Sequence, residues 1–117
     1  MIKVILLKEK SFEFAKLLLS LYYNIQPESM DIDTHKQLIR AGVSIGALCR
    51  EAELAESEAE FSDKMAIAQR KCSETIYWLE LLKATDRLDE LIFLSIHENA
   101  VELLKQITRA RKTRNKP

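Results

Sequence analysis

The sequence predicts an all-α protein, an antiparallel up-down-up-down four-helix bundle, and three observations predict it. Only two glycines and two prolines occur in 117 residues, which disfavours a β fold with its many turns. Apolar residues recur at alternating steps of three and four along four successive stretches. The connections between these stretches are short, which favours antiparallel neighbours. A chain of this length forms a single domain, residues 1–117, that can bury a core without disulfides or a metal.

The first predicted helix runs from about residue 12 to residue 25, with Ser11 as its N-cap. It ends ahead of Pro27, because the residue before a proline is pushed out of the α region. Residues 1–10 precede this helix as an N-terminal arm. The apolar run at residues 4–7 is too short to decide between an extended arm and an early helix start.

The second predicted helix covers about residues 34–55 and carries a narrow heptad seam. Ser57 and Glu60 form a capping box, in which the serine oxygen accepts from a backbone N–H and the glutamate reaches back. The box predicts a tight turn near residue 56 and a third helix over residues 58–84. The apolar face of this third helix is wider than one neighbour can cover. Its seam consists of Phe61, Met65, Ala68, Cys72, Thr75, Leu79 and Leu82.

The fourth predicted helix covers about residues 89–111, with Asp86 or Asp89 as its cap, and residues 109–117 form a basic C-terminal tail. The formal net charge is zero, so no global basic field attracts nucleic acid. The charge is uneven, because all six charged residues from Glu51 to Asp63 are acids and all six after Glu102 are bases. These two clusters are either solvated surfaces or contacts for partners.

Gly42 and Gly46 both lie inside the second predicted helix, where each costs about 0.5–1 kcal/mol relative to alanine. The cost indicates that something packs closely, either a helix of the same chain or a neighbouring subunit. We favour the subunit, because the broad third helix also needs covering. Nearby charges could instead be ordinary surface residues, and the aromatics could be core residues or a platform for bases. The predicted subunit-interface residues are Arg40, Gly42, Ser44, Gly46, Arg50, Glu51, Tyr77 and Trp78.

No catalytic, cofactor-binding or metal-binding residues are predicted. A di-metal site in a bundle needs Glu-x-x-His on two helices, and neither His35 nor His97 has a glutamate at that spacing, so both are expected at the surface or at helix ends. Cys49 and Cys72 are interpreted as small core residues of a reduced, cytoplasmic protein. No stretch approaches the ~20 apolar residues of a membrane span. We therefore expect no cofactor, no membrane contact and no small-molecule substrate.

Three runs in the sequence carry a resemblance to a known family. They are SFEFA at 11–15, QLIRAGVSIGA at 37–47 and ETIYWLELL at 74–82. In this order and spacing, over about residues 10–108, the chain resembles the bacterial four-helix-bundle proteins called 23S rRNA intervening-sequence proteins. It departs from their pattern at Leu48, where the family usually has an asparagine.

The resemblance implies an antiparallel four-helix bundle that assembles into a homopentamer, a barrel with a central channel. It implies a poorly defined function. Members are encoded within insertions in large-subunit rRNA genes or as free-standing genes. A related branch acts as the accessory protein of diversity-generating retroelements and uses a basic surface to bind nucleic acid and a reverse transcriptase. This chain lacks the basic balance of that branch.

Three hypotheses about function follow. The first is a non-enzymatic homo-oligomer, with five copies as the resemblance implies. The second is an accessory protein that binds RNA or DNA through its tail, where several copies on one end of a ring would add avidity. The third is an enzyme with Cys49 or Cys72 as nucleophile, which would need a nearby histidine. The predicted nucleic-acid contacts are Lys105, Arg109, Arg111, Lys112 and Arg114.

Overall fold

The computed structural model describes residues 2–24 and 32–114, and nearly all of these residues are helical. Within the two ranges there is no β-strand, which confirms the all-α prediction. The four helices are α1 (Ile2–Asn24), α2 (Ile32–Glu53), α3 (Glu58–Ala84) and α4 (Glu90–Arg114).

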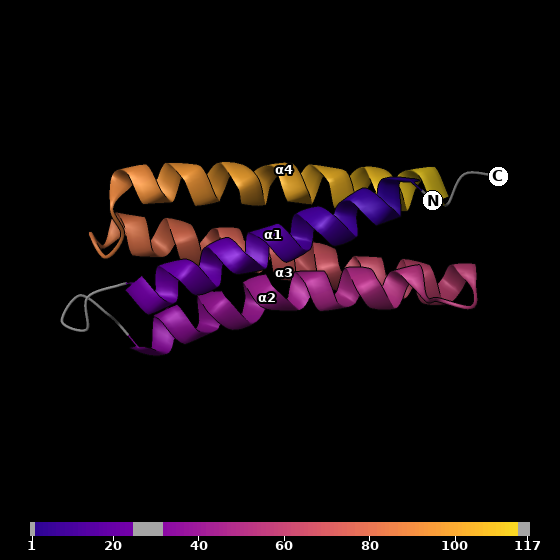
Figure 1. Cartoon of the computed structure of the whole chain (residues 1–117), viewed down its shortest axis with the longest axis horizontal. Helices are drawn as coiled ribbons and strands as arrows, with labels where there is room; N and C mark the ends of the chain where they lie inside the picture. Colours follow the sequence, from indigo (N-terminus) through magenta and orange to yellow (C-terminus); the bar gives the residue numbers. More distant parts are fainter. Residues whose placement is uncertain (1, 25–31, 115–117) are drawn as a thin grey trace.

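The helices lie side by side in an elongated bundle, 51 Å long and 19 Å across in both other directions. Both α1 and α3 pack against α2 and α4, so α2 and α4 occupy opposite corners of the bundle. In Figure 1 the chain reverses direction from each helix to the next, so the start of α1 and the end of α4 share one end of the bundle. The turn between α2 and α3 lies at the same end. This course is compatible with the predicted up-down-up-down order.

The core is a central column of apolar side chains to which every helix contributes one stripe. All seven predicted seam residues of α3 are buried, which confirms the heptad rhythm along that helix. α3 faces α2 on one side and α4 on the other, so two helices of the same chain share its broad apolar face. Leu18 of α1, Ile45 of α2 and Ile107 of α4 are completely buried on the facing stripes.

The ends of α3 are fixed by local chemistry. Ser57 is the N-cap, and its hydroxyl oxygen accepts a 3.0 Å hydrogen bond from the Glu60 backbone N–H. The Glu60 carboxylate reaches back to the N–H of Glu56 at 3.2 Å, one residue earlier than in a standard capping box. The predicted span of residues 58–84 and the predicted tight turn are therefore confirmed.

In the connection from α3 to α4, a residue with left-handed backbone conformation ends α3 and an aspartate then caps the start of α4. The N–H of Asp86, at a φ of 57°, donates to Lys83 O at 3.1 Å, and the N–H of Arg87 donates to Leu82 O at 2.8 Å. These two bonds are the Schellman pattern that ends a helix. Of the two predicted caps for α4, Asp89 is the one used, because its carboxylate accepts from the backbone N–H of Leu91 at 3.1 Å.

The beginning of α1 corrects the sequence analysis. The helix starts at Ile2, so residues 2–10 belong to it and do not form an extended arm. Ser11 is not an N-cap; it is a buried residue inside the helix, and its hydroxyl donates to Lys8 O at 3.2 Å. Leu7 and Ser11 continue the seam of Phe14 toward the N-terminus, but a serine at a seam position hid that continuity.

The other predicted helix ends shift by a few residues. α2 begins and ends two residues earlier than predicted, and α4 continues three residues further, to Arg114. The first part of the predicted tail is thus helical. Residues 25–31, which include the predicted end of the first helix, and residues 115–117 lie outside the described residues.

Candidate interaction surfaces

The two glycines mark the closest approach between α1 and α2. A Cβ placed on Gly42 would stand 1.9 Å from Leu18 Cδ1, and one on Gly46 would stand 3.6 Å from the carbonyl oxygen of Ser11. Both neighbours belong to α1 of the same chain. Of the two alternatives left by the sequence, the structure shows the intrachain one for this close approach. That the glycines also contact a neighbouring subunit stays a prediction.

The other predicted interface residues of α2 lie along its outer side. Arg40 is exposed, and the guanidinium of Arg50 lies 5.6 Å from the centre of the Phe12 ring of α1. Ser44 is half-buried and its hydroxyl donates to Ala41 O at 2.7 Å. Arg50 and Ser44 are thus engaged by α1 and by α2 itself, while half of the Phe12 surface, 50%, stays open to solvent.

The acidic cluster lies on the turn between α2 and α3. Glu51 accepts a 2.8 Å hydrogen bond from Lys64, and this bond and the Glu51 charge raise the pKa of the lysine. Glu53 pairs with Lys8 of α1 at 3.0 Å. Because both pairs are partly exposed, solvent screens them and they contribute little to stability. The cluster is therefore partly neutralised from within the chain, and Glu56 remains exposed at its tip.

Tyr77 and Trp78 behave differently although they are adjacent on α3. Tyr77 is 57% exposed, whereas Trp78 is half-buried against the core and its Nε1 donates to Glu74 at 3.2 Å. Their rings meet edge to face, with centres 5.2 Å apart. Trp78 is thus mainly a packing residue, and Tyr77 is the member of the pair that could contact a partner.

The basic end of α4 divides into two sets. Lys105, Arg109 and Lys112 are exposed, and none of them forms an ion pair within the described residues. Arg111 is instead held against α3, because its guanidinium donates to Gln69, whose amide donates in turn to Thr108 at 2.9 Å. The side chain of Arg114 lies outside the described residues.

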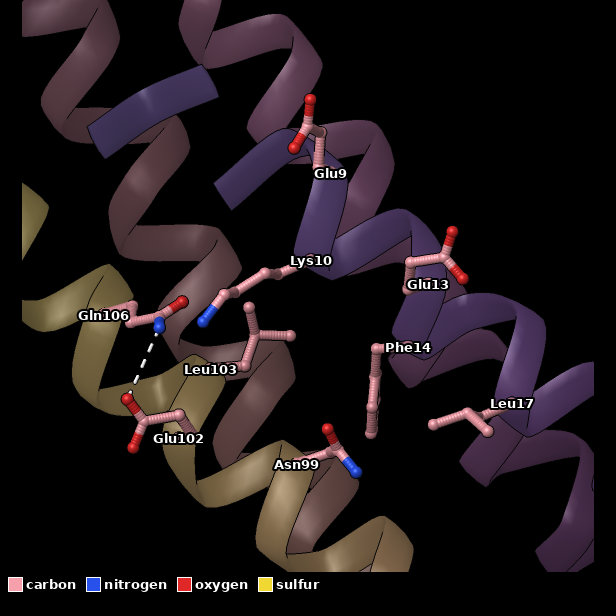
Figure 2. A pocket seen from close by; sticks show the side chains of 9 residues that line it. All are labelled: Glu9, Lys10, Glu13, Phe14, Leu17, Asn99, Glu102, Leu103 and Gln106. Atoms are coloured by element: carbon pink, nitrogen blue, oxygen red, sulfur yellow. Dashed lines mark hydrogen bonds between the residues drawn. The ribbon is translucent and has the colours of Figure 1, made fainter. Parts of the chain in front are cut away.

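A groove of about 300 Å³ runs between α1 and α4 (Figure 2). Phe14, Leu17 and Leu103 form its apolar part, and the Lys10 side chain crosses from α1 toward Gln106 of α4. Gln106 donates to Glu102 at 3.3 Å, but its own amide oxygen is buried without a hydrogen-bond partner. Buried acceptors are nearly always hydrogen-bonded in native proteins. The contact between α1 and α4 therefore lacks one donor, the one that the Gln106 oxygen needs. The polar rim of the groove consists of Glu9, Lys10, Glu13, Asn99, Glu102 and Gln106.

A smaller pocket of about 120 Å³ lies further along the same seam, toward the end where the basic residues gather. Leu6 and Leu7 of α1 and Gln106 and Arg109 of α4 line it. Leu6 is nearly half exposed and Leu7 is buried, so the pocket opens from the core to the surface. It combines an apolar wall with a cationic rim.

Leu54 is an exposed apolar side chain on the turn between α2 and α3, at the same end of the bundle as the smaller pocket. It follows directly after α2 and is 79% exposed, between Glu53 and Glu56. Its backbone N–H donates to Arg50 O at 3.3 Å and to Glu51 O at 3.2 Å, so the turn holds it in place. The sequence analysis missed this leucine and the pocket, although an isolated leucine among six acids was a visible signal.

The two histidines and two cysteines are spread over three helices, with His35 and Cys49 on α2, Cys72 on α3 and His97 on α4. His35 is buried near the start of α2, in contrast to the expected surface position, although it does lie at a helix end. His97 contacts Glu80 at 2.9 Å and stacks on Phe93. Burial raises the pKa of Cys49 to about 11 and that of Cys72 to about 12, so both thiols stay protonated at neutral pH. Thiols are poor nucleophiles in that form.

Two features are absent from the described residues. No group of three or more histidine, cysteine, aspartate or glutamate side chains is placed to hold a metal ion there. None of the four helices, over the same residues, is apolar along a stretch long enough to cross a membrane.

Comparison with known proteins identifies the family. A family model described as 23S rRNA-intervening sequence protein matches residues 4–109. The chain belongs to this family. A crystal structure of a protein with unknown function from the S23 ribosomal protein family of Bacteroides thetaiotaomicron VPI-5482 superposes with a TM-score of 0.89. The two are 39% identical, over 94% of this chain and 98% of the other. None of the curated proteins matches the sequence.

Proposed function

We propose that this member of the 23S rRNA-intervening sequence family is a non-enzymatic protein that works as a homo-oligomer of antiparallel, up-down-up-down bundles. The observation that carries the proposal is the amount of apolar surface left open. Eleven large hydrophobic side chains of the described residues are at least 36% exposed, and they come from α1, α3, α4 and the turn after α2. Single exposed leucines are ordinary, but so many on a 19 Å wide bundle favour contact between copies.

The intrachain role of the glycines changes where those contacts are expected. Gly42 is buried beneath α1, so this glycine is not open to a partner. The candidates are instead the exposed apolar side chains themselves, such as Phe12, Leu54 and Tyr77. The buried, protonated cysteines give no support to the enzyme hypothesis.

Light scattering at micromolar concentration tests the proposal. The expected mass is several times that of one chain, and five copies is the number implied by the family resemblance. A monomeric mass at every concentration tested would refute the assembly. Circular dichroism on the same samples must show the helical signal, so that unfolded protein is not mistaken for monomer.

A second candidate function is binding of RNA or DNA at the basic end of α4. It is favoured by Lys105, Arg109 and Lys112, which are exposed together without ion-pair partners in the described part of the chain. Affinity for RNA should then fall steeply with salt, because binding releases counterions. Removing residues 109–117 should weaken binding and flatten its salt dependence. Unchanged affinity after that deletion would exclude the tail as the contact.

A further inference from the structure

The exposed leucine after α2 and the pocket between α1 and α4 lie at the same level of the bundle. The 3.0 Å ion pair between Lys8 and Glu53 fixes this level, since Glu53 precedes Leu54 and Lys8 follows Leu7. Figure 1 shows the start of α1, the end of α2 and the end of α4 together at one end. The two features are thus matched in height.

They also lie on different sides of the molecule. The pocket is in the seam of α1 and α4, whereas Leu54 is on the turn from α2 to α3. α2 does not contact α4, and α1 contacts both, so Leu54 and the α4 wall of the pocket lie on different sides of α1. A chain therefore cannot insert its own Leu54 into its own pocket, but a laterally placed copy can do so.

The two features match in size and charge. Truncating a buried leucine side chain leaves a cavity of about 150 Å³, so a pocket of about 120 Å³ is of the right order for one leucine. Leu54 is flanked by Glu53 and Glu56, while Arg109 on the pocket rim is exposed and forms no ion pair within the described residues. The exposed Leu54 side chain, called the knob below, is thus flanked by acids, and the pocket rim carries a base.

We propose that Leu54 of one copy inserts into the pocket formed by Leu6, Leu7, Gln106 and Arg109 of the next copy, with Glu56 facing Arg109. This inference rests on the proposed homo-oligomeric function and names its contact. The apolar insertion supplies affinity, and the charges set the register and the approach. Gln106, whose amide oxygen is buried without a hydrogen-bond partner, lines this pocket as well as the larger groove.

The contact is heterologous, because each copy gives a knob on one side and a pocket on the other. Such contacts close into rings when the rotation between copies allows it. Preorganisation favours the contact, since the knob is held by backbone hydrogen bonds and by the link from Glu60 to Glu56, so little entropy is lost on docking.

The test uses a knob variant, Leu54→Asp, and a pocket variant, Leu6→Asp, in the full chain. Leu91→Asp is the matched control, because Leu91 is 77% exposed but lies at the opposite end of the bundle, at the start of α4. Circular dichroism and urea denaturation establish that each variant folds. The mass of each is then measured by light scattering over a range of concentrations.

We expect both interface variants to be monomeric where the wild type is assembled, with dissociation constants raised about tenfold or more. The Leu91→Asp control should keep the wild-type mass. Leu54→Asp keeps an intact pocket, and Leu6→Asp keeps an intact Leu54. Mixing the two variants should therefore restore one contact, in which Leu54 of the second variant enters the pocket of the first. The mixture should therefore give a species of two chains that grows no further.

The outcomes separate the two proposals. A monomeric wild type would overturn the proposed function itself. An assembled wild type whose mass is unchanged by Leu54→Asp would overturn only this contact and leave self-assembly standing. Equal disruption by Leu91→Asp, or a mixture that stays monomeric, would also count against the knob and pocket. Arg109→Gln should keep the assembly but reduce its sensitivity to salt, since the ionic part is screened and the leucine is not.

Discussion

Gly42 of α2 lies directly beneath the side chain of Leu18 of α1, so close that a Cβ on the glycine would come within 1.9 Å of Leu18 Cδ1. Leu18 is completely buried and Phe14 stands behind the same position, 3.6 Å from that Cβ. The leucine therefore has little room to move aside. The glycine is retained for a contact inside the chain, which explains its helix-weakening presence in the middle of α2.

The first prediction compares the two glycines. Gly42→Ala should lower the free energy of unfolding by about 1 kcal/mol, because overpacking costs about 1–3 kcal/mol and alanine returns only about 1 kcal/mol of helix propensity. Gly46→Ala should raise it by about 0.5–1 kcal/mol, since its nearest neighbours would be at 3.6 Å, an ordinary contact distance. Urea denaturation measures both.

A second substitution distinguishes the clash from other causes. Adding Leu18→Val to Gly42→Ala removes the atom that collides and should recover part of the lost stability. If Gly42→Ala and Gly46→Ala stabilise the protein equally, the close approach of Leu18 is not what keeps Gly42 a glycine.

The second prediction concerns the helix caps. Ser57→Ala and Asp89→Ala should each lower the free energy of unfolding by about 1 kcal/mol, because each removes the side chain that satisfies a free N–H at a helix start. Ser73→Ala, an exposed substitution within α3, serves as the control and should stay within about 0.5 kcal/mol. An equal loss of unfolding free energy at all three positions would mean that the lost caps do not cause the destabilisation.

Comparison of α3 with α1 shows what the sequence can predict. Both ends of α3 were predictable, because a capping box begins it and an uninterrupted heptad seam runs through it. The start of α1 was not, because Ser11 occupies a seam position and resembles a cap. Ser57 correctly marks the start of α3, whereas Ser11 wrongly suggests the start of α1. Only their tertiary neighbours distinguish the two serines.

The candidate surfaces were harder to predict than the fold. The glycines indicated a close approach, but the spacing of residues on α2 cannot tell which helix approaches. The pocket joins Leu6 and Arg109, which are far apart in the sequence and meet only because α1 and α4 are neighbours. The six-base pattern was visible, yet the contact from Arg111 to Gln69, which removes one base from the free set, required coordinates.

The third prediction concerns the left-handed residue after α3. Asp86→Gly should raise the free energy of unfolding by about 0.5–1 kcal/mol, because glycine adopts a φ of 57° without the strain that a side chain brings. Asp86→Val should lower it, since β-branched residues are strongly disfavoured there. Thermal or urea denaturation decides the sign. Stabilisation by valine would exclude backbone strain as the reason.

The fourth prediction concerns alkaline pH and the two buried thiols. Burial raises the pKa of Cys49 to about 11 and that of Cys72 to about 12, above the value of 9.0 for an unburied thiol. The stability from protonated thiols is therefore complete below pH 9.0 and is lost as pH rises toward the folded values, because the unfolded chain ionises first. At about pH 10.5 each thiol should have lowered the free energy of unfolding by about 2 kcal/mol.

The control for this effect is the double variant Cys49→Ala/Cys72→Ala. It starts from a lower stability, because two buried side chains are shortened, but it lacks the titrating thiols. All other ionisable groups are the same in both proteins, so the difference between their pH profiles isolates the cysteines. Parallel profiles from pH 8 to about pH 10.5 would contradict the raised thiol pKa values. A steeper fall in the wild type would show that the core keeps both thiols protonated.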